Sequence, residues 1–357
     1  MFYNFTICWN GLVLLGTFYS KNSISYTQSA GNSGPVEGPQ GPSATADRRA
    51  QGTHRGPQRS SSETTRGTSC NKFSEFRNLY AKLGHTNFIN DDWLYWFIGF
   101  TEGDGAILSY NGRPQFVITQ KERNILAHIQ RVLDFGSLSA ITQKGAIYYR
   151  FTVMDLKHIL LLVLLFNGNL AITKSVQHLG RWVNDVNARL TLPGSVIYGL
   201  CLPVTHINSL FLPTLSDPWL SGFTDADGCF NVNICKRKEA KSGFRVILRF
   251  ILDQKHAKLL LEFIRDLFGS GFVSIRGVDM YRYTNVSFSG LSAIVYYLKS
   301  FPLKSKKGAS FTNWLKVYVL VLNKEHLTDK GLSEIRAIKK TININNSLCT
   351  KIGSSQP

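Results

Sequence analysis

The sequence predicts an α+β fold made of two pseudo-symmetric copies of one unit, each in the order helix, two strands, helix, two strands and helix. Three observations support this expectation: a ten-residue motif occurs twice, further matches follow it in the same order, and apolar and polar residues alternate after the second motif. A chain of 357 residues with 43% apolar residues can bury the cores of two such domains. A mini-protein and a wholly disordered chain are therefore excluded.

The duplication begins with WFIGFTEGDG at 96–105, which matches WLSGFTDADG at 219–228. Three further matches follow in order: FVITQK at 116–121 with FILDQK at 250–255, Phe135-Gly136 with Phe268-Gly269, and Lys174 and Trp182 with Lys306 and Trp314. The separation rises from 123 to 134 residues between the first two matches, so the second copy carries 11 extra residues in its first pair of strands. We expect repeats over 91–190 and 217–325, joined by a linker at 191–216.

The ends of the chain differ from the repeats in composition. Residues 1–70 predict an N-terminal extension that is largely disordered, because 21–68 is rich in Gly, Ser, Pro and Thr. Residues 1–20 are apolar and uncharged, and they are the one stretch that approaches the length of a membrane span. The extension could equally be an upstream exon or a cleaved leader. A lead-in at 71–90 and a C-terminal helix and tail at 326–357 complete the expected division.

Periodicity predicts the elements within the second copy. Phe230, Val232 and Ile234 alternate with polar residues, which indicates a half-buried strand, and apolar residues alternate again from Phe244 to Leu252. Helical spacing over 256–267 stops at Gly269. We expect another strand over 281–288 and a helix over 328–340 that begins at a capping hydroxyl.

The charge balance indicates the kind of partner. The chain has 41 Lys and Arg against 23 Asp and Glu, a net charge of +18, which favours a polyanion. Nucleic acid is the first candidate, and an anionic membrane surface or a ribosome comes next. The six cysteines form no CxxC pair, which indicates a reducing compartment and no structural zinc.

Each repeated helix ends with two acidic residues, Glu102 and Asp104 in the first copy and Asp225 and Asp227 in the second. A helix C-terminus is the negative end of the helix dipole, so these carboxylates cost stability there. Because this unfavourable pattern occurs twice, it indicates that the carboxylate charges have a function. The alternative is that both motifs are ordinary helix stops with an exposed acid.

The same helices carry small residues four positions apart, which would let two helix backbones approach closely. These are Gly99 and Gly103, and Gly222 and Ala226. If the two helices pack along this stripe, Asp104 and Asp227 lie side by side. Adjacent carboxylates repel each other unless they share a proton or bind a cation, for which magnesium is the simplest candidate.

The two motifs resemble the signature helices of the double-motif LAGLIDADG homing endonucleases, which are often encoded within organellar introns. The resemblance covers about 91–340, with Glu102 in place of the usual Asp and Phe97 in place of the leading Leu. It implies a monomer with pseudo-twofold symmetry in which antiparallel four-stranded sheets form a DNA-binding saddle. It also implies a double-strand break, made by phosphodiester hydrolysis in a long asymmetric DNA site and dependent on Mg²⁺, with Mn²⁺ able to substitute.

The resemblance also assigns site residues. Asp104 and Asp227, with Gly103 and Ala226 beside them, would hold the metal ions. Gln120 and Gln254 would organise water in the active site. Lys174 and Lys306 match the family's helix-flanking lysine, although a solvated lysine is an equal alternative.

DNA contacts are expected from the outward faces of the strands, where basic and amide side chains bind phosphates or base edges. The expected residues are Gln115, Lys121, Lys236, Arg237, Lys238, Lys241, Arg245, Arg249, Arg276 and Arg282. The alternative for 236–238 is a flexible, solvated hairpin tip. The longer hairpin of the second copy predicts an asymmetric, non-palindromic target.

Two rival functions remain on the same fold. One is an RNA maturase that assists splicing of its own group I intron, with that RNA as a further partner, and the other is a DNA-binding regulator. Intact acids in both motifs favour the enzyme over either. No obligate protein partner is expected. The family indicates a mitochondrial location with a chloroplast as the alternative, and 1–20 lacks the arginines of an import signal.

Overall fold

The computed structural model describes residues 72–239 and 242–343 of the chain. The predictions for the N-terminal extension, and for the C-terminal tail from residue 344, lie outside these residues. Within the described ranges, no helix is both long and apolar enough to cross a membrane.

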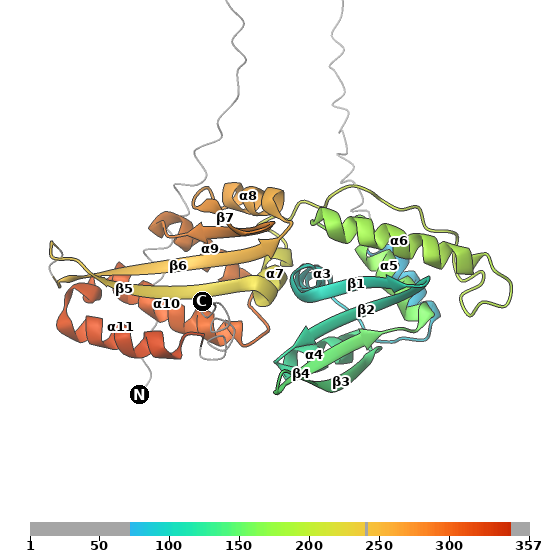
Figure 1. Cartoon of the computed structure of the whole chain (residues 1–357), viewed down its shortest axis with the longest axis horizontal. Helices are drawn as coiled ribbons and strands as arrows, with labels where there is room; N and C mark the ends of the chain where they lie inside the picture. Colours follow the sequence, from blue (N-terminus) through green and yellow to red (C-terminus); the bar gives the residue numbers. More distant parts are fainter. Residues whose placement is uncertain (1–71, 240–241, 344–357) are drawn as a thin grey trace, which may run out of the picture. The chain divides into compact units, whose positions relative to one another are not determined.

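The first repeat places one antiparallel four-stranded sheet against helices (Figure 1). The strand order is β1-β2-β4-β3, so the two hairpins of the repeat meet along β2 and β4. The elements are α2 (Ser74–Lys82), α3 (Asp91–Asp104), β1 (Gly105–Tyr110), β2 (Arg113–Gln120), α4 (Arg123–Leu133), β3 (Ser137–Gln143), β4 (Ala146–Val153), α5 (Leu156–Phe166) and α6 (Thr173–Leu190).

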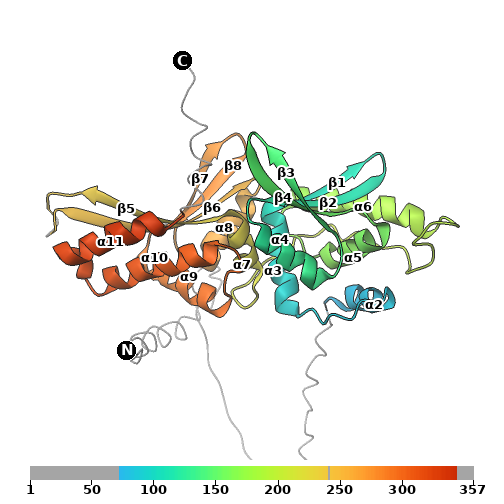
Figure 2. The same cartoon turned by 90° about the horizontal axis from the view of Figure 1, so that it is seen from below.

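The second repeat has the same strand order, β5-β6-β8-β7. Its elements are α7 (Trp219–Asp227), β5 (Gly228–Lys236), β6 (Phe244–Lys255), α8 (Lys258–Leu267), β7 (Phe272–Gly277), β8 (Met280–Asn285), α9 (Phe288–Ser300), α10 (Lys307–Leu322), the 3-10 turn η2 (Glu325–Leu327) and α11 (Asp329–Thr341). The predicted α+β architecture of two αββαββα units is therefore confirmed. In both repeats the helices lie along one face of the sheet (Figure 2).

Strand alternation produces this layering. In β6, Leu248, Phe250 and Leu252 are buried beneath the sheet, where Phe250 contacts Phe230 of β5. Phe230 in turn packs against Trp314 of α10. Burying these side chains on one face leaves the other face of each sheet for the polar and basic residues between them.

Two segments outside the repeats are packed onto the first one. The lead-in contains α2, whose Phe76 is buried and whose Tyr80 hydroxyl donates to the Leu133 carbonyl at 3.1 Å. The linker is held by Asn187 of α6, whose side-chain amide donates to the Val204 carbonyl at 2.9 Å and accepts from its N–H at 2.8 Å.

Most element boundaries match the predicted ones, with one clear exception. The strand expected over 281–288 ends at Asn285, because the Ser287 hydroxyl accepts the Gly290 N–H and α9 begins at Phe288. The C-terminal helix begins as predicted at a capping hydroxyl, where Thr328 accepts the Gly331 N–H at 3.1 Å.

Candidate functional site

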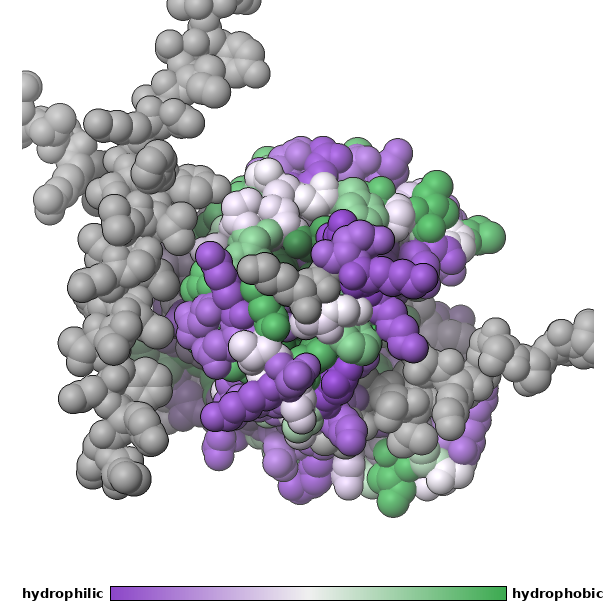
Figure 3. Space-filling view, turned by 90° about the vertical axis from the view of Figure 1, so that its left-hand side faces the viewer, coloured by the Kyte–Doolittle hydropathy of each residue, from purple (hydrophilic) through white to green (hydrophobic). Residues whose placement is uncertain are grey.

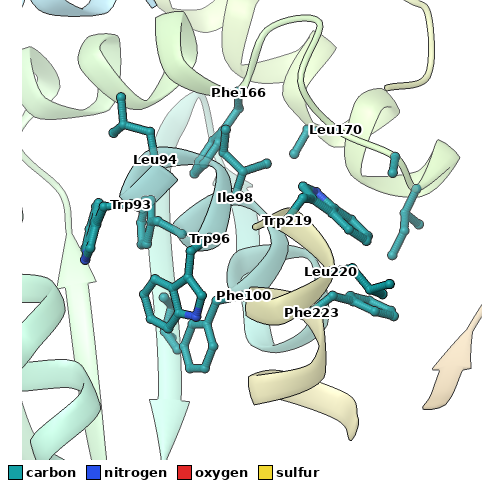
Figure 4. Packing of buried hydrophobic residues seen from close by; sticks show 14 of the residues in the cluster. Trp93, Leu94, Trp96, Ile98, Phe100, Phe166, Leu170, Trp219, Leu220 and Phe223 are labelled. Carbon is teal, nitrogen blue, oxygen red and sulfur yellow. The ribbon is translucent and has the colours of Figure 1, made fainter. Parts of the chain in front are cut away.

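The site is built on the contact between α3 and α7. A Cβ atom added at Gly99 would lie 1.9 Å from the Trp219 carbonyl oxygen, and one added at Gly222 would lie 1.9 Å from the Trp96 carbonyl oxygen. The two backbones therefore touch through paired glycines, with large apolar side chains around the contact (Figure 4). This close approach requires the small residues predicted for the stripe.

The helix ends bring the second acid of each motif to one place. A Cβ atom at Gly103 would lie 3.0 Å from the Oδ2 atom of Asp227. The Gln120 side-chain amide donates to Asp104, and that of Gln254 donates to Asp227 at 2.8 Å. Each carboxylate is thus held by the glutamine at the end of the second strand of its own repeat.

Burial dominates the ionisation of both carboxylates. It raises the pKa of Asp104 to about 6, against the opposing effects of Lys307 and Gln120. It raises the pKa of Asp227 well above the ordinary value, and the negative charge of Asp104 adds to this shift. Two half-buried acids so close together therefore resist carrying two negative charges at once.

Among the residues that the structure describes, the cation whose charge acts on both acids is Lys307, which is half-buried. Its ammonium donates to the Ala226 carbonyl. Burial lowers the pKa of Lys307, and the nearby Asp104 and Asp227 oppose that shift. The resemblance predicts Lys306, the residue just before it, as the helix-flanking lysine of this repeat.

The predicted lysines lie elsewhere. Lys306 is exposed, and its backbone N–H donates to Glu122 at 2.9 Å. Lys174, at the start of α6, is exposed at the edge of a hollow that Glu102 and Gln254 also line. The structure thus places neither of these two ammonium groups among the partners of the acid pair, where it places Lys307.

The first acid of the first motif has a structural role. The Glu102 carboxylate accepts the backbone N–H groups of Ala171 at 2.5 Å and Ile172 at 2.9 Å, just before α6. Burial raises the pKa of Glu102 to about 7, and these hydrogen bonds oppose the shift. The Glu102 carboxylate therefore binds at the N-terminus of α6, the positive end of that helix dipole.

The first acid of the second motif does the same for α10. Asp225 accepts the N–H groups of Lys304 at 2.7 Å and Ser305 at 3.1 Å. It also accepts the indole N–H of Trp96 from the other repeat at 2.9 Å. The first acids, Glu102 and Asp225, therefore hold helices together, whereas the second acids form the pair at the helix ends.

The outward face of the first sheet carries both residues predicted for DNA contact. Gln115 alternates in β2 with the buried Phe116, and Lys121 follows the strand with its ammonium 5.4 Å from the ring centre of Tyr148. Sequence reasoning missed Arg150 of β4, which is exposed and donates to a β2 threonine on this face. The alternating pattern of 146–153 was the signal for it.

The outward face of the second sheet is richer in arginine. Four predicted residues, Arg245, Arg249, Arg276 and Arg282, line one hollow there. Both oxygens of Asp253 bind Arg282. The Arg282 Nε atom donates to Oδ1 at 2.6 Å, and its Nη2 atom donates to Oδ2 at 2.5 Å. The structure thus separates Arg282 from the others by giving it an internal partner.

The β5–β6 hairpin tip holds the remaining predicted basic residues. Lys236, Arg237 and Lys238 are exposed. The Arg237 Nε atom lies 3.6 Å from the Oε2 atom of Glu239. Lys241 lies outside the described residues. Hydrophilic residues make up much of the described surface at this end of the second repeat (Figure 3).

Known proteins resemble this chain in sequence. The family model for LAGLIDADG endonucleases matches residues 220–318. A probable intron-encoded endonuclease 4 of Neurospora crassa is 33% identical over 71% of this chain and 45% of its own length. An uncharacterized cox1 intron-2 protein of Schizosaccharomyces pombe is 27% identical over 68% of this chain and 70% of its own. The chain spans less than half of the first relative.

Solved structures resemble it in fold. The LAGLIDADG meganuclease I-AabMI, bound to uncleaved DNA, superposes with a TM-score of 0.57 at 24% identity, over 71% of this chain and all of that one. Meganuclease I-SmaMI, bound to uncleaveable DNA, superposes with a TM-score of 0.55 at 21% identity, over 72% and 98%. Residues 220–318 thus match the LAGLIDADG endonuclease family in sequence, and two motif helices with two matching sheets give the chain the fold of the double-motif meganucleases.

Proposed function

We propose that the chain is a sequence-specific homing endonuclease that hydrolyses one phosphodiester bond in each strand of a long, asymmetric DNA site. The observation that carries this proposal is the pair of half-buried carboxylates, Asp104 and Asp227, held by matching glutamines between two sheets with basic outward faces. A protein that only binds nucleic acid gains nothing from two mutually repelling acids at helix ends. Two pseudo-symmetric halves also fit two scissile bonds.

The donor set fits a hard divalent cation. Within the described residues, no three His, Cys, Asp or Glu side chains lie close enough together to hold a metal ion. The protein therefore does not supply a full set of metal ligands there. Two carboxylates completed by water and substrate phosphate are the usual surroundings of Mg²⁺, and Mn²⁺ can replace it. We propose that Asp104 and Asp227 hold this ion, which would activate water and neutralise the leaving oxygen.

The other side chains have roles that do not depend on the ion. Gln120 and Gln254 fix the two carboxylates through their side-chain NH2 groups, and among the described residues the Gln120 carbonyl oxygen is left to orient water. In the second copy the Gln254 oxygen accepts the Lys255 N–H at 2.7 Å. We place Lys307 as the cation that stabilises negative charge at the centre, a role expected earlier of Lys306.

The expected setting follows from the relatives. The Schizosaccharomyces pombe relative is named after an intron of cox1, a mitochondrial gene, so we propose a mitochondrial intron as the origin of this chain. Both halves of the site lie in one chain, so we propose that a monomer acts on double-stranded DNA without a protein partner.

The test is cleavage of a duplex library that includes any known intron-insertion junction. We expect one double-strand cut with Mg²⁺ or Mn²⁺ and none with Ca²⁺ or EDTA. Asp104→Asn and Asp227→Asn should each leave at most slow nicking, whereas Glu334→Gln, an exposed acid on α11, should cut like the parent. Unchanged cutting by both aspartate variants would disprove the assignment of the site.

The maturase alternative is an outcome of the same experiment. Binding of duplex DNA without cutting, together with faster splicing of the host intron in the presence of the protein, would replace the endonuclease by an RNA-splicing function. Cutting together with faster splicing would show a bifunctional protein.

A further inference from the structure

The outer part of the second sheet is a two-stranded ribbon. β8 pairs with β6 only from Phe250 to Lys255, so 244–249 has β5 as its only neighbour in the sheet. In the first sheet, β4 pairs with β2 from Phe116 onward, which leaves only 113–115 in the corresponding position. The second ribbon is longer by three residues a strand, or about 10 Å at 3.3 Å per residue.

One face of this ribbon is free of the core. Leu248 and Phe250 are buried beneath the sheet, and alternation along the strand places Arg245, Ile247 and Arg249 on the outward face. Across the ribbon, Arg249 pairs with Asn231 and Arg245 pairs with Cys235. The two arginines therefore lie on one side of the same strand, four residues apart.

Internal partners distinguish the arginines of this face. Arg282 is held by both oxygens of Asp253, which satisfies its guanidinium within the protein. Within the described ranges, Arg245 and Arg249 form no ion pair and no side-chain hydrogen bond. The guanidinium N–H groups of both residues are therefore available to donate two hydrogen bonds to a pair of acceptors on a bound molecule.

We propose that Arg249 and Arg245 are the base-reading residues of the longer arm and that each recognises a guanine, whereas Arg282 keeps its bond to Asp253. The inference rests on the proposed function, because it assumes that duplex DNA lies over the outward faces. The major groove admits a two-stranded ribbon, and arginine with two free donors matches the N7 and O6 acceptors of guanine. Four residues span about 13 Å, so the two guanines lie two to four base pairs apart.

The experiment is selection of bound duplexes from a randomised library by the full chain, with Ca²⁺ replacing Mg²⁺ so that bound DNA stays whole. The parent should select two guanines at this spacing in one half-site. Arg249→Gln should lower the preference for the inner guanine by about 5- to 150-fold and favour adenine there, leaving the outer guanine unchanged. Arg245→Gln should do the same at the outer position only.

Arg336→Gln is the matched control, because Arg336 lies on α11 over the ring of Phe244, at 4.7 Å. It removes the same charge and should leave the selected sequence unchanged. A uniform loss of affinity in Arg249→Gln with both guanines retained would overturn the proposal in favour of phosphate contact, and so would a parent site without the guanine pair. Selection without later cutting in Mg²⁺ would refute the endonuclease function and leave the base reading intact.

Discussion

The Asp104, Asp227 and Lys307 side chains form a half-buried group with two potential negative charges and one positive charge. Each is partly removed from water, and burial is the main cause of every pKa shift among them. The ammonium compensates one carboxylate, while the second raises the cost of ionising the pair. A divalent cation would remove that cost, which is why these residues suit a metal-dependent reaction better than simple binding.

The raised pKa of Asp104 predicts a pH-dependent stability in metal-free buffer. The unfolded carboxyl has a pKa near 3.9, and the folded one about 6, so the folded state binds more protons between these values. The free energy of unfolding should therefore fall as the pH rises from about 4 to about 6, by on the order of 2 kcal/mol. Glu102 and Asp227, whose pKa values are also raised, add their own contributions over the same range. Asp104→Asn should therefore reduce the fall between pH 4.5 and 7.5 by only the Asp104 share in denaturant titrations, and an equal fall in the variant would contradict the assignment.

The adjacent lysines Lys306 and Lys307 provide a paired test. Lys307→Met should lower the rate of DNA cleavage by about 100-fold, because it removes the half-buried positive charge beside both carboxylates. Lys306→Met, with an exposed side chain one position earlier, should cut within a few-fold of the parent. Single-turnover cleavage rates measure both, and the reverse order would restore the role to Lys306.

These residues show what the sequence could and could not predict. Asp104 and Asp227 were predictable, because the repeated motif and the small residues before them fix where two helix ends meet. Lys307 was not, since adjacent lysines look equivalent until the start of α10 determines which one points inward. The bond between Arg282 and Asp253 depends on the pairing of β6 with β8, which no short motif encodes.

At the level of elements, α3 and α7 act as the rigid axis of the protein. Their backbones touch through Gly99 and Gly222, and the first acids, Glu102 and Asp225, tie α6 and α10 to the same helices. The position of the acid pair is thus determined by backbone contact and helix capping rather than by flexible side chains. The proposed hydrolysis needs this fixed position, because in-line attack tolerates little displacement of the catalytic groups.

Gly99→Ala tests the close contact directly. The new methyl group would lie 1.9 Å from the Trp219 carbonyl oxygen, so the two helices must separate, and we expect a loss of about 3 kcal/mol in the free energy of unfolding. Gly277→Ala is the control, because a Cβ there has no neighbour within 4 Å. Chemical denaturation measures both, and a Gly99→Ala variant as stable as the control would show that the interface can relax.

Across the whole molecule, the two repeats have the same motif helix and the same capping of a later helix by its first acid. They differ in the length of their ribbons, in their lysines and in their C-terminal helices. The second has the longer ribbon, the half-buried Lys307 and the added helix α11, whereas the first has a short ribbon and an exposed Lys174. Fusing both halves in one chain lets each diverge, which a symmetric dimer could not do. The duplication and its insertion predicted this asymmetry from sequence, but the contribution of the lead-in could not be predicted.

The lead-in predicts how far the chain can be shortened at its N-terminal side. Phe73, Phe76, Leu79 and Tyr80 are buried in the first repeat, so they belong to its core although they precede the duplicated unit. A chain that begins at Gly84 should lose about 5 kcal/mol or more of unfolding free energy relative to one that begins at Lys72, since each of these side chains contributes about 1.5–3 kcal/mol. Thermal unfolding of the two chains measures the difference. Equal midpoints would mean that α2 packs without stabilising the fold and that the folded domain starts with α3.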